Sequence, residues 1–345
     1  MAEFQLSPAV DLAPLTTLGV PARAAWFGMP RSLDALREAF AYARTHRLPT
    51  LILGGGSNLI FARDYPGLVI KLDLRGREKI GETPAAHLIR VAAGEIWRDT
   101  VAWTLAQGWP GLENLALIPG SVGAAPIQNI GAYGLELSER FHSLEAFDPR
   151  SGELLSLDRD ACRFGYRDSV FKHPDDAGLV VVSVTLALPK RWEARANYRD
   201  IAEELGAQGI ATPTPQAIFD AVVHVRQRKL PNPTELGNVG SFFKNPVVSA
   251  EQAEKLRRDF PNIVTYPQAD HRVKLAAAWL IDQAGWKGHV RGHAAVHARQ
   301  ALVLVNLGGA SGAEILALAE MIRADVERKF GVLLEQEPIT VSHPN

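Results

Sequence analysis

A pair of phenylalanines flanked by polar side chains marks one segment of the chain as a candidate for chemistry. The stretch GNVGSFFKNPVV holds Ser241 before Phe242 and Phe243, and Lys244 with Asn245 after them. Two adjacent phenylalanines bury a large apolar surface and can fix a backbone in place. A hydroxyl, an ammonium group and an amide beside this anchor can donate protons or hydrogen bonds to a ligand. The pattern suits a plain strand poorly and favours one wall of a polar pocket.

The segment LGGGSNLIF predicts an anion-binding loop. Gly54, Gly55 and Gly56 lie between apolar runs, where they allow a sharp turn that presents consecutive N–H groups to an anion, especially a pyrophosphate. Ser57 and Asn58 add side-chain donors. No Gly-Lys-Ser/Thr follows, and the glycine spacing differs from the dinucleotide fingerprint, so neither motif is present. A tight glycine turn without a ligand remains the alternative.

A second glycine-rich segment, ALIPGSVGAAPIQNIGAYG at residues 116–134, is almost uncharged and fits no regular element. Loops of this length in compact domains are usually functional or disordered, and this one is too apolar for disorder. Its glycines allow close approach of a flat or extended ligand, to which Gln128, Asn129 and Tyr133 can hydrogen-bond. Two such loops in one chain suggest a large dinucleotide that is contacted along its length.

Two further clusters carry polar chemistry. In RFGYRDSVFK, the dense charge favours a solvated loop; as a site, Arg167 could form a bidentate pair with a carboxylate. His289, His293 and His297 sit four apart and would line one face of a helix, as metal ligands can. Two glycines interrupt that stretch and no carboxylate accompanies it, so we expect a surface or partner role and no metal site.

The bulk composition describes an ordinary globular chain. Its 345 residues suggest roughly two domains. With 37 basic and 38 acidic residues the net charge is −1. This overall charge does not indicate binding to nucleic acid or to an anionic membrane. The single cysteine, Cys162, excludes an intrachain disulfide and fits a reducing compartment. The sequence shows neither a signal-peptide pattern nor an apolar run of about 18 residues, so we expect a cytoplasmic protein that does not enter the membrane.

Hydrophobic periodicity and capping residues predict an α+β protein with two α/β parts. Ser32 is expected to open a helix, Pro215 to stand in the first turn of another, and Ser249–Gln252 and Ser311–Glu314 to form capping boxes. Helices are expected within residues 31–49, 96–109, 212–233, 247–260, 273–285 and 311–331. Strands are expected within residues 49–61, 67–74, 87–94, 143–149, 179–190 and 332–341.

The segments LGGGSN, IPGSVGAAPIQNIGAYG, YRDSVFK, GSFFKNP and LEQE occur in an order and spacing that resembles the UDP-N-acetylenolpyruvoylglucosamine reductase family of peptidoglycan precursor synthesis. The resemblance covers about residues 16–341, and the insert reaching Tyr198 is similar to the longer of the two family forms. It implies an α+β FAD-binding fold of the flavin-oxidase (PCMH/VAO-like) type. The expected parts are an FAD-binding lobe at 1–75, to which strand 332–345 returns, a second FAD-binding lobe at 76–228, and a substrate-binding domain at 229–331.

The resemblance also implies a reaction. NADPH would reduce a noncovalent FAD, which would pass hydride from N5 to the vinyl carbon of the enolpyruvyl ether and give UDP-N-acetylmuramate. The charge left on the neighbouring carbon spreads into the carboxylate and needs preorganised donors. The implied partners are the UDP-sugar and NADPH, without nucleic acid or membrane, and the chain is expected to be a monomer.

The matched motifs assign roles to individual residues. The implied catalytic residues are Ser241 as proton donor, with Arg167 and Glu337 on the substrate carboxylate; Glu337 would act protonated, which requires a raised pKa. The implied cofactor-binding residues are Gly54, Gly55, Gly56, Ser57, Asn58, Pro119, Gly120, Ser121, Gly123, Ala124, Gln128, Gly131, Tyr133, Gly134 and Arg226. The implied substrate-binding residues are Tyr198, Lys229, Asn245 and Gln300.

Some features depart from the family pattern. The usual Asn-Thr near the N-terminus is replaced by Thr16-Thr17, and Glu337 is followed by Pro338 rather than valine. Glu335 lies two residues before Glu337 and would share its strand face, so alternation cannot separate them; motif register favours Glu337.

Two other functions were weighed. The first is an FAD-dependent oxidase of the same fold, many of which tether FAD through a histidine or cysteine near the first glycine loop. Here Ser57 and Asn58 occupy that neighbourhood, and the one cysteine is Cys162. The second is a non-catalytic UDP-sugar binder, against which the joint retention of Ser241, Arg167 and Glu337 argues.

Overall fold

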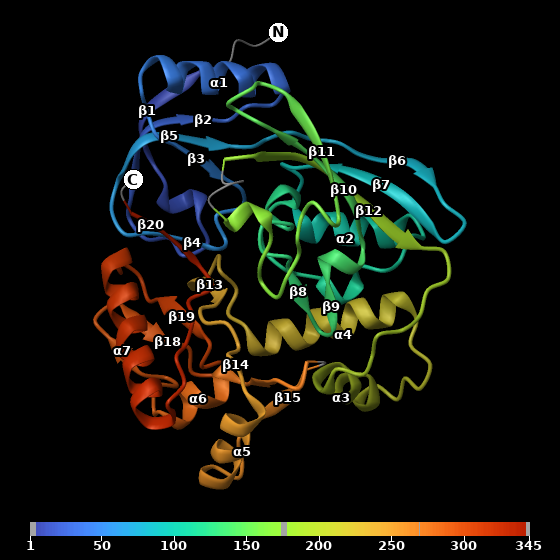
Figure 1. The fold of residues 1–345 in the computed structure, drawn as a ribbon, viewed down its shortest axis with the longest axis vertical. Helices are drawn as coiled ribbons and strands as arrows, with labels where there is room; N and C mark the ends of the chain where they lie inside the picture. Colours follow the sequence, from blue (N-terminus) through green and yellow to red (C-terminus); the bar gives the residue numbers. More distant parts are fainter. Residues whose placement is uncertain (1–4, 174–177, 269, 343–345) are drawn as a thin grey trace. The chain divides into compact units, whose positions relative to one another are not determined.

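The chain forms two compact units in the computed structural model, which describes residues 5–173, 178–268 and 270–342 (Figure 1). The first unit comprises Met1–Val10, Ala24–Gly55 and Pro66–Arg228, and the second comprises Asp11–Arg23, Gly56–Tyr65 and Lys229–Asn345. Each unit is therefore assembled from segments that are far apart in the sequence. The lobe borders expected after residues 75 and 228 stay predictions.

The first unit begins with a four-stranded sheet covered by one helix. Helix α1 (Leu33–Thr45) starts at Ser32, whose hydroxyl accepts a hydrogen bond from the Ala35 N–H, as the sequence predicts. Its buried face, including Leu36 and Phe40, packs in one core cluster with Leu68 and Ile70 of the sheet. The strands run in the order β1 (Leu6–Asp11), β2 (Arg23–Gly28), β5 (Tyr65–Lys71) and β3 (Thr50–Leu53).

A five-stranded antiparallel sheet and three helices complete the first unit. Its strands run in the order β11 (Leu154–Asp158), β10 (Phe141–Phe147), β12 (Val180–Pro189), β7 (Ala86–Ala92) and β6 (Arg77–Glu82), which confirms the strands expected within residues 87–94, 143–149 and 179–190. The helices are α2 (Trp97–Ala106), α3 (Arg199–Ala207) and α4 (Pro215–Lys229). Proline suits the first helical position because its missing N–H would have no partner there. Both sheet and helices contribute to one large core.

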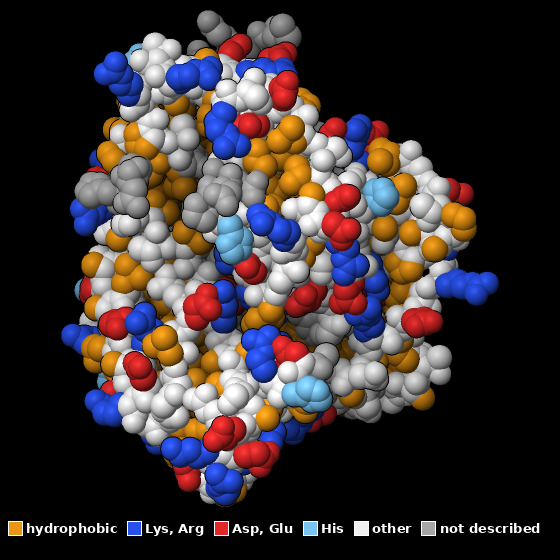
Figure 2. Space-filling model, in the orientation of Figure 1, with side chains coloured by type: hydrophobic (Ala, Val, Ile, Leu, Met, Phe, Trp, Pro, Cys, Tyr) orange, Lys and Arg blue, Asp and Glu red, His pale blue; other side chains and the backbone are white. Residues whose placement is uncertain are grey.

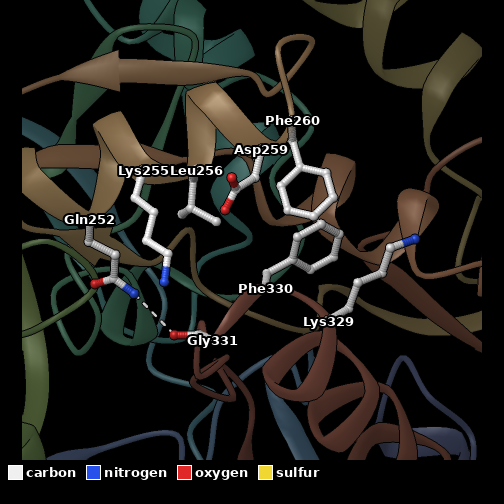
Figure 3. A pocket seen from close by; sticks show the side chains of 8 residues that line it. All are labelled: Gln252, Lys255, Leu256, Asp259, Phe260, Lys329, Phe330 and Gly331. Carbon is white, nitrogen blue, oxygen red and sulfur yellow. Dashed lines mark hydrogen bonds between the residues drawn. The ribbon is translucent and has the colours of Figure 1, made fainter.

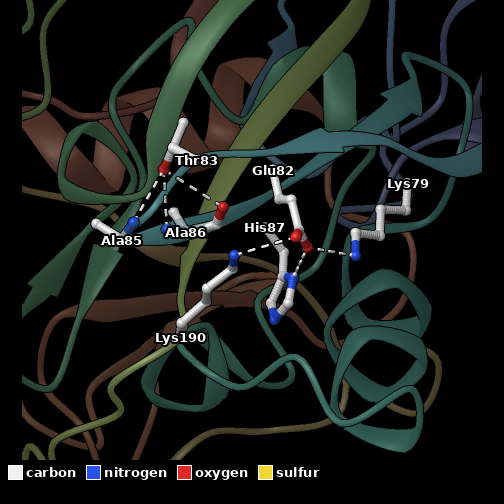
Figure 4. A network of polar contacts seen from close by, with 7 residues as sticks. All are labelled: Lys79, Glu82, Thr83, Ala85, Ala86, His87 and Lys190. Atoms are coloured by element: carbon white, nitrogen blue, oxygen red, sulfur yellow. Dashed lines mark hydrogen bonds and ion pairs between the residues drawn. The ribbon is translucent and has the colours of Figure 1, made fainter.

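A small charged network holds the end of the β6–β7 hairpin (Figure 4). The Glu82 carboxylate accepts from Lys79 Nζ at 2.8 Å and lies 3.3 Å from Lys190 Nζ. The hydroxyl of Thr83, in the turn, accepts from the N–H groups of Ala85 and Ala86. The hydrogen bonds from the two lysines lower the pKa of Glu82 to about 2.

In its described residues, the second unit contains three small sheets and three α-helices. Its antiparallel sheets run β13 (Gly237–Ser241), β19 (Val303–Asn306), β18 (Ala294–Val296), β17 (Val290–Arg291), and β14 (Val247–Val248), β16 (Val273–Leu275), β15 (Thr265–Pro267). Strand β20 (Ile339–Val341) pairs in parallel with β4 (Leu59–Phe61). The helices are α5 (Ala250–Asp259), α6 (Ala277–Gln283) and α7 (Gly312–Phe330).

Short elements fill the connections of both units. They are the 3₁₀ turns η1 (Ala13–Leu15), η2 (Glu113–Leu115), η3 (Val122–Ala124), η4 (Leu137–Glu139) and η5 (Val170–Lys172), and the strand pair β8 (Gly131–Ala132) and β9 (Leu135–Glu136). The segment at residues 116–134 thus contains only η3 and β8, which agrees with its expected irregularity.

Three local predictions were wrong in part. Val273–Leu275 forms strand β16 rather than the first turn of a helix, because Val273 and Leu275 are buried with Lys274 between them, which is the period of a strand. Ser249 caps α5, but the Gln252 side chain donates to the Gly331 carbonyl instead of completing a capping box. Of the strand expected within residues 332–341, only Ile339–Val341 forms regular pairing.

Charges of both signs are interspersed over the face of the molecule drawn in Figure 2, as the balanced composition would suggest. Within the residues described, none of the helices is both long and apolar enough to span a membrane.

Candidate active site

The two predicted glycine loops touch each other in the first unit. A Cβ atom placed on Gly55 would lie 2.5 Å from Gly120 Cα, and one placed on Gly54 would lie 2.7 Å from Ser121 Oγ. Ordinary contacts of a Cβ begin at 3.4 Å. Gly55 is therefore required by the close approach of two backbones, and Gly54 by the side chains of Ser121 and Ala124, independently of any ligand. This contact brings four predicted cofactor residues together.

The structure divides the first glycine loop between the units. Gly56, Ser57 and Asn58 belong to the second unit. There the Asn58 carbonyl accepts from the Ile339 N–H at 2.9 Å, and its side-chain amide donates to the Glu337 carbonyl at 3.4 Å. The end of this loop is thus fastened to the segment that carries the predicted catalytic carboxyl.

The second glycine loop is held by its own buried amide. Asn129 is 1% exposed; its Nδ2 donates to the Glu136 carboxylate and to the Gly165 carbonyl, and its Oδ1 accepts from the Ser138 N–H. Protein groups use both amide hydrogens of Asn129, and its expected hydrogen bond to a ligand stays a prediction. The remaining predicted residues of this loop, Pro119, Gly123, Ala124, Gln128, Gly131 and Gly134, lie along the same segment.

The backbone is strained around this loop. Of the eight non-glycine residues with positive φ in the described ranges, Leu117, Asn129 and Tyr133 lie in this loop, and Arg167 hydrogen-bonds to it. Such conformations cost free energy and persist where the surroundings enforce them, which is common at functional sites. The positive φ values gathered at this loop support the functional role that its sequence suggests.

Arg167 is placed against the second glycine loop. Its Nη2 donates to the Gly131 carbonyl at 2.7 Å, and its guanidinium lies 5.4 Å from the centre of the Tyr166 ring. Lys172 Nζ donates to the Arg167 carbonyl at 3.0 Å and supports the turn. The planar fork of an arginine held in this way is suited to carboxylate recognition.

The guanidinium of Arg226, on helix α4, is buried away from solvent. Burial lowers the pKa of Arg226 and raises the pKa of Tyr133, to whose hydroxyl Arg226 donates a hydrogen bond. Among the residues that the structure describes, Tyr133 is the one polar group that acts on the pKa of Arg226. A desolvated cation next to a neutral phenol suits a bound anion.

In the second unit, the backbones of Ser241 and Glu337 are neighbours. Ser241 ends β13, and the carbonyl of the next residue, Phe242, accepts from the Glu337 N–H at 2.9 Å. Phe242 and Phe243 are 0% and 1% exposed, and Phe243 forms a bridge with Gln336. The phenylalanine pair therefore anchors the segment as the sequence predicts, with Ser241 beside it.

The environments of the two candidate carboxyls differ. Glu335 is 71% exposed at its side chain and forms an ion pair with Lys244, whereas Glu337 is only half-buried. Strand alternation does not apply because this segment is irregular on both sides of the Gln336 bridge. The ion pair commits Glu335 to Lys244, which supports the choice of Glu337 made from motif register.

The predicted substrate-binding residues occupy distinct positions. Asn245 Oδ1 accepts from the Ala277 N–H at the start of α6, which leaves its amide nitrogen as the donor toward a ligand. Gln300 Oε1 accepts from the Leu302 N–H, two residues along. Lys229 ends α4, and Tyr198 precedes α3 with 41% exposure. Lys229, Asn245 and Gln300 belong to the second unit and Tyr198 to the first.

The three histidines lie on a hairpin rather than a helix. His289 precedes β17, His293 lies in the turn, and His297 follows β18. Burial, followed by the nearby Arg299 charge, lowers the pKa of His297. Across the described ranges, no three His, Cys, Asp or Glu side chains are placed to hold a metal ion.

A cavity of about 270 Å³ lies at the ends of α5 and α7 (Figure 3). Phe260 and Phe330 meet there at 4.8 Å between ring centres, and the Gln252 side chain crosses to the Gly331 carbonyl. None of its lining residues is a predicted site residue, and we assign no chemistry to it.

Comparison with known proteins identifies the family. Residues 232–341 match the model described as "UDP-N-acetylenolpyruvoylglucosamine reductase, C-terminal domain", and residues 25–158 match "FAD binding domain". The UDP-N-acetylenolpyruvoylglucosamine reductase of Paraburkholderia phymatum is 57% identical over 330 residues, which cover 95% of each chain. The protein of the same name from Paraburkholderia phytofirmans is 55% identical and covers 98% of this chain and 99% of its own.

The chain belongs to the UDP-N-acetylenolpyruvoylglucosamine reductase family. The crystal structure of a family member from Thermus caldophilus matches 99% of both chains with a TM-score of 0.67 at 24% identity. Together with the FAD binding domain, this match confirms the predicted α+β FAD-binding fold. As a member of the reductase family, the chain is a flavoprotein oxidoreductase that binds FAD.

Sequence reasoning missed the buried polar residues that support these loops. Asn114 is 2% exposed and donates from Nδ2 to the carbonyls of Tyr133 and Arg195. Ser169 is fully buried and donates to the Ile127 carbonyl at 2.6 Å. Asn114 precedes the apolar run LALIP, which was an available signal, whereas Ser169 lies in the charged segment RFGYRDSVFK, where nothing in the sequence pointed to its burial.

Proposed function

We propose that the protein reduces the enolpyruvyl ether of UDP-N-acetylenolpyruvoylglucosamine to the D-lactyl ether of UDP-N-acetylmuramate, with electrons from NADPH. The relatives that cover nearly the whole chain support this substrate. The observation that carries the chemistry is the adjacency of Ser241 and Glu337, held beside a fully buried phenylalanine pair. When bound, FAD would supply the hydride chemistry that links NADPH to the vinyl carbon of the substrate.

Ser241 is proposed to deliver the proton that completes the reduction. Hydride addition at the terminal carbon leaves negative charge on the carbon next to the carboxylate, as an enolate. A serine hydroxyl is a weak acid, but such an enolate is basic enough to take its proton. The buried Phe242 anchors the backbone next to Ser241, and a fixed backbone would lower the entropic barrier to proton transfer.

Arg167 and Glu337 are proposed to stabilise the charge that develops on the substrate carboxylate. The hydrogen bond to Gly131 orients the Arg167 fork, and two parallel N–H donors stabilise a carboxylate better than a point charge does. Glu337 must be protonated to donate to the same carboxylate, and desolvation by bound substrate would favour the neutral form.

The glycine loops and Arg226 are proposed to hold FAD. Arg226 would meet its diphosphate, since burial and a phenol partner leave the guanidinium suited to an anion. Gly54, Gly55, Gly120 and Ser121 lie together, and their backbone N–H groups would donate to the cofactor. The other residues proposed to contact FAD are Gly56, Ser57, Asn58, Pro119, Gly123, Ala124, Gln128, Gly131, Tyr133 and Gly134.

Four residues are proposed to bind the UDP-sugar. Tyr198 and Lys229 would contact the diphosphate, and Asn245 and Gln300 other polar groups of the substrate. The Asn245 amide is oriented by the α6 N-terminus, so its Nδ2 would donate to a substrate oxygen. The monomeric state and the cytoplasmic location stay predictions.

A spectrum of the purified protein, followed by anaerobic NADPH and then the enolpyruvyl substrate, tests the proposal. We expect a noncovalent flavin spectrum, bleaching by NADPH, and recovery of the oxidised spectrum with one equivalent of UDP-N-acetylmuramate formed. Flavin that is reoxidised by oxygen but not by the enolpyruvyl substrate would contradict it. Yellow colour that stays with acid-precipitated protein would instead favour a covalent oxidase.

A further inference from the structure

Strand β13 contains a bulge immediately before Ser241. Asn238 pairs with Val305 of β19, and Ser241 pairs with Val303. Three steps along β13 therefore match two steps along β19, which means that β13 carries one extra residue between these pairs. Bulges of this kind are common beside active sites, where they change the direction in which a side chain points.

The bulge decides on which face of the sheet Ser241 lies. Side chains alternate between the two faces of a strand, so residues three apart normally point to opposite faces. Paired residues share a face. Because Val303 and Val305 lie two apart on β19, their partners Ser241 and Asn238 point to the same face. Without the extra residue, Ser241 would lie on the other face.

The face that the serine shares is covered by the segment that follows α4. Val303 and Val305 belong to a core cluster on which Leu230 and Leu236 pack. Leu230 comes directly after α4, whose last residue is proposed to bind the substrate diphosphate. The bulge therefore turns the proposed proton donor toward the face covered by this segment.

Gly240 forms the bulge in a conformation that residues with a side chain seldom adopt. Its φ is 72°, and a Cβ placed on it would meet nothing within 4 Å. Glycine is therefore required here by its backbone conformation and not by lack of space. Asparagine enters the left-handed region more readily than most residues do, so it should preserve the bulge better than alanine.

The side chain of Asn238 holds the bulge in place. Asn238 is 3% exposed, and its Oδ1 accepts from the Gly240 N–H at 3.0 Å. Its Nδ2 donates to the Leu236 carbonyl at 2.9 Å and to the Pro231 carbonyl at 3.2 Å. One planar amide thus joins the bulge to both ends of the 231–236 loop.

The Ser241 side chain is half-buried, and among the residues that the structure describes no group hydrogen-bonds to its hydroxyl. A serine hydroxyl has one hydrogen to donate, and a protein acceptor would occupy it. The bulge therefore directs a hydroxyl that is available to a ligand.

We propose that Asn238 and Gly240 are positioning residues, which hold the bulge and so direct the Ser241 hydroxyl toward the reacting carbon. The proposal rests on the proton-donor role given above to Ser241. A proton donor works only within hydrogen-bond reach of the atom that it protonates, and misplacement by about 1 Å can slow a reaction about 100-fold. Both residues act through the backbone that carries the serine.

Anaerobic stopped-flow of Gly240→Ala and Gly240→Asn tests the positioning. Alanine is strained in the left-handed conformation, so reoxidation of the reduced flavin by the enolpyruvyl substrate should slow at least about tenfold. Reduction by NADPH should stay near the normal rate, and asparagine should recover most of the lost reoxidation rate. Equal rates of reoxidation in Gly240→Ala and the unaltered protein would overturn the proposal.

Gly331→Ala is the matched control for strain. Gly331 caps α7 in the same unit with φ of 62°, and a Cβ there also meets nothing within 4 Å. Alanine at this position should lower stability as it does at Gly240 but leave reoxidation unchanged. If both variants slow reoxidation equally, the loss comes from general destabilisation and the positioning role is wrong.

A double-mutant cycle shows whether Gly240 acts through Ser241. In Ser241→Ala protein, adding Gly240→Ala should slow reoxidation no further, because no hydroxyl remains to be misplaced. Slowing by the same factor in both backgrounds would mean that the glycine acts elsewhere, and the proposal would be wrong.

Asn238→Ala keeps the proposal testable if Gly240→Ala unfolds or loses FAD. It removes the acceptor for the Gly240 N–H and should give the same selective loss of reoxidation. Asn306→Ala is its control, because Asn306 on β19 is also buried and its side chain bonds only to residues 18–19, 308 and 310, outside the bulge. Normal reoxidation in folded Asn238→Ala would contradict its positioning role.

The variants separate this proposal from the function on which it rests. If Ser241→Ala reoxidises its flavin at the normal rate, the proton-donor role is wrong, whatever the glycine variants do. If Ser241→Ala is slow but folded Gly240→Ala and Asn238→Ala reoxidise normally, Ser241 donates the proton and the positioning proposal is wrong.

Discussion

Replacing Gly55 with alanine tests whether the two glycine loops form one FAD-binding surface. The new Cβ would lie 2.5 Å from Gly120 Cα, 3.0 Å from its carbonyl carbon and 3.3 Å from its nitrogen. All three neighbours are backbone atoms, so no side chain can rotate away. Restoring an ordinary 3.4 Å contact requires the loops to part by about 0.9 Å. Overpacking of this kind costs about 1–3 kcal/mol.

Two measurements on the Gly55→Ala protein follow from that displacement. Urea unfolding of the apoprotein should show a free energy of unfolding lower by about 1–3 kcal/mol. Flavin fluorescence titration should show FAD affinity lower by at least tenfold, or about 1.4 kcal/mol, because the N–H groups of the two loops no longer converge.

Gly206→Ala is the matched control for Gly55→Ala. Gly206 lies in helix α3 of the same unit, and a Cβ there meets nothing within 4 Å. Alanine should leave FAD affinity unchanged and stabilise the helix by up to about 1 kcal/mol. If Gly55→Ala behaves like this control, the loops do not touch and the account of the FAD site is wrong.

Three further predictions concern substrate binding, charge stabilisation and acid stability. Lys229→Ala should raise the Kd for the UDP-sugar about tenfold or more and leave flavin reoxidation at saturation nearly unchanged; a slower chemical step at unchanged affinity would contradict its role. Arg167→Lys should slow flavin reoxidation by substrate at least tenfold, because an ammonium cannot replace a fork; a rate equal to that of the unaltered protein would show that the fork is not used. The pKa of Glu82 falls from 4.5 to about 2 in the fold, chiefly through hydrogen bonds from Lys79 and Lys190, so its stabilisation is complete above pH 4.5 and is lost as the pH falls toward 2. Glu82→Gln should therefore lose less stability than the unaltered protein between pH 5 and pH 3 in thermal melts, and parallel losses would refute that reasoning.

Local signals in the sequence were sufficient for the starts of α1, α4 and α7 and for the end of α7. Ser32 caps α1, Pro215 opens α4, and Ser311 with Glu314 forms a complete capping box at α7, which ends at Gly331 with φ of 62°. Each of these devices acts within one turn of the chain, so a single sequence contains all the information that it needs.

Contacts between distant segments could not be predicted from patterns in the sequence. Gln252 stands at the position of a capping box, yet its amide donates to Gly331, which packing brings to it. Val273–Leu275 is too short for its period to be separated from the helix that follows, and its pairing with β14 and β15 decides for a strand. A pattern within one segment cannot report a partner that lies elsewhere in the chain.

In the candidate site too, local sequence patterns could be predicted, and contacts between distant residues could not. Motif register pointed to both glycine loops, to Arg167 and to Ser241, because glycine runs and flanked phenylalanines are local patterns. It could not show that Asn129 is occupied by protein groups or that Asn114 joins two loops, because these contacts span 36 and 81 residues of chain. Buried polar residues of this kind can be identified only when the structure shows which groups hydrogen-bond to them.

Anaerobic stopped-flow of the Ser241→Ala protein is the most direct test of the proposed chemistry, because it follows the two half-reactions separately. We expect NADPH to reduce the flavin within about twofold of the normal rate, since no proton from Ser241 is needed there. Reoxidation of the reduced flavin by the enolpyruvyl substrate should slow by at least about 100-fold, as expected for losing a general acid. Equal slowing of both half-reactions, or normal reoxidation, would contradict the role of Ser241 as proton donor.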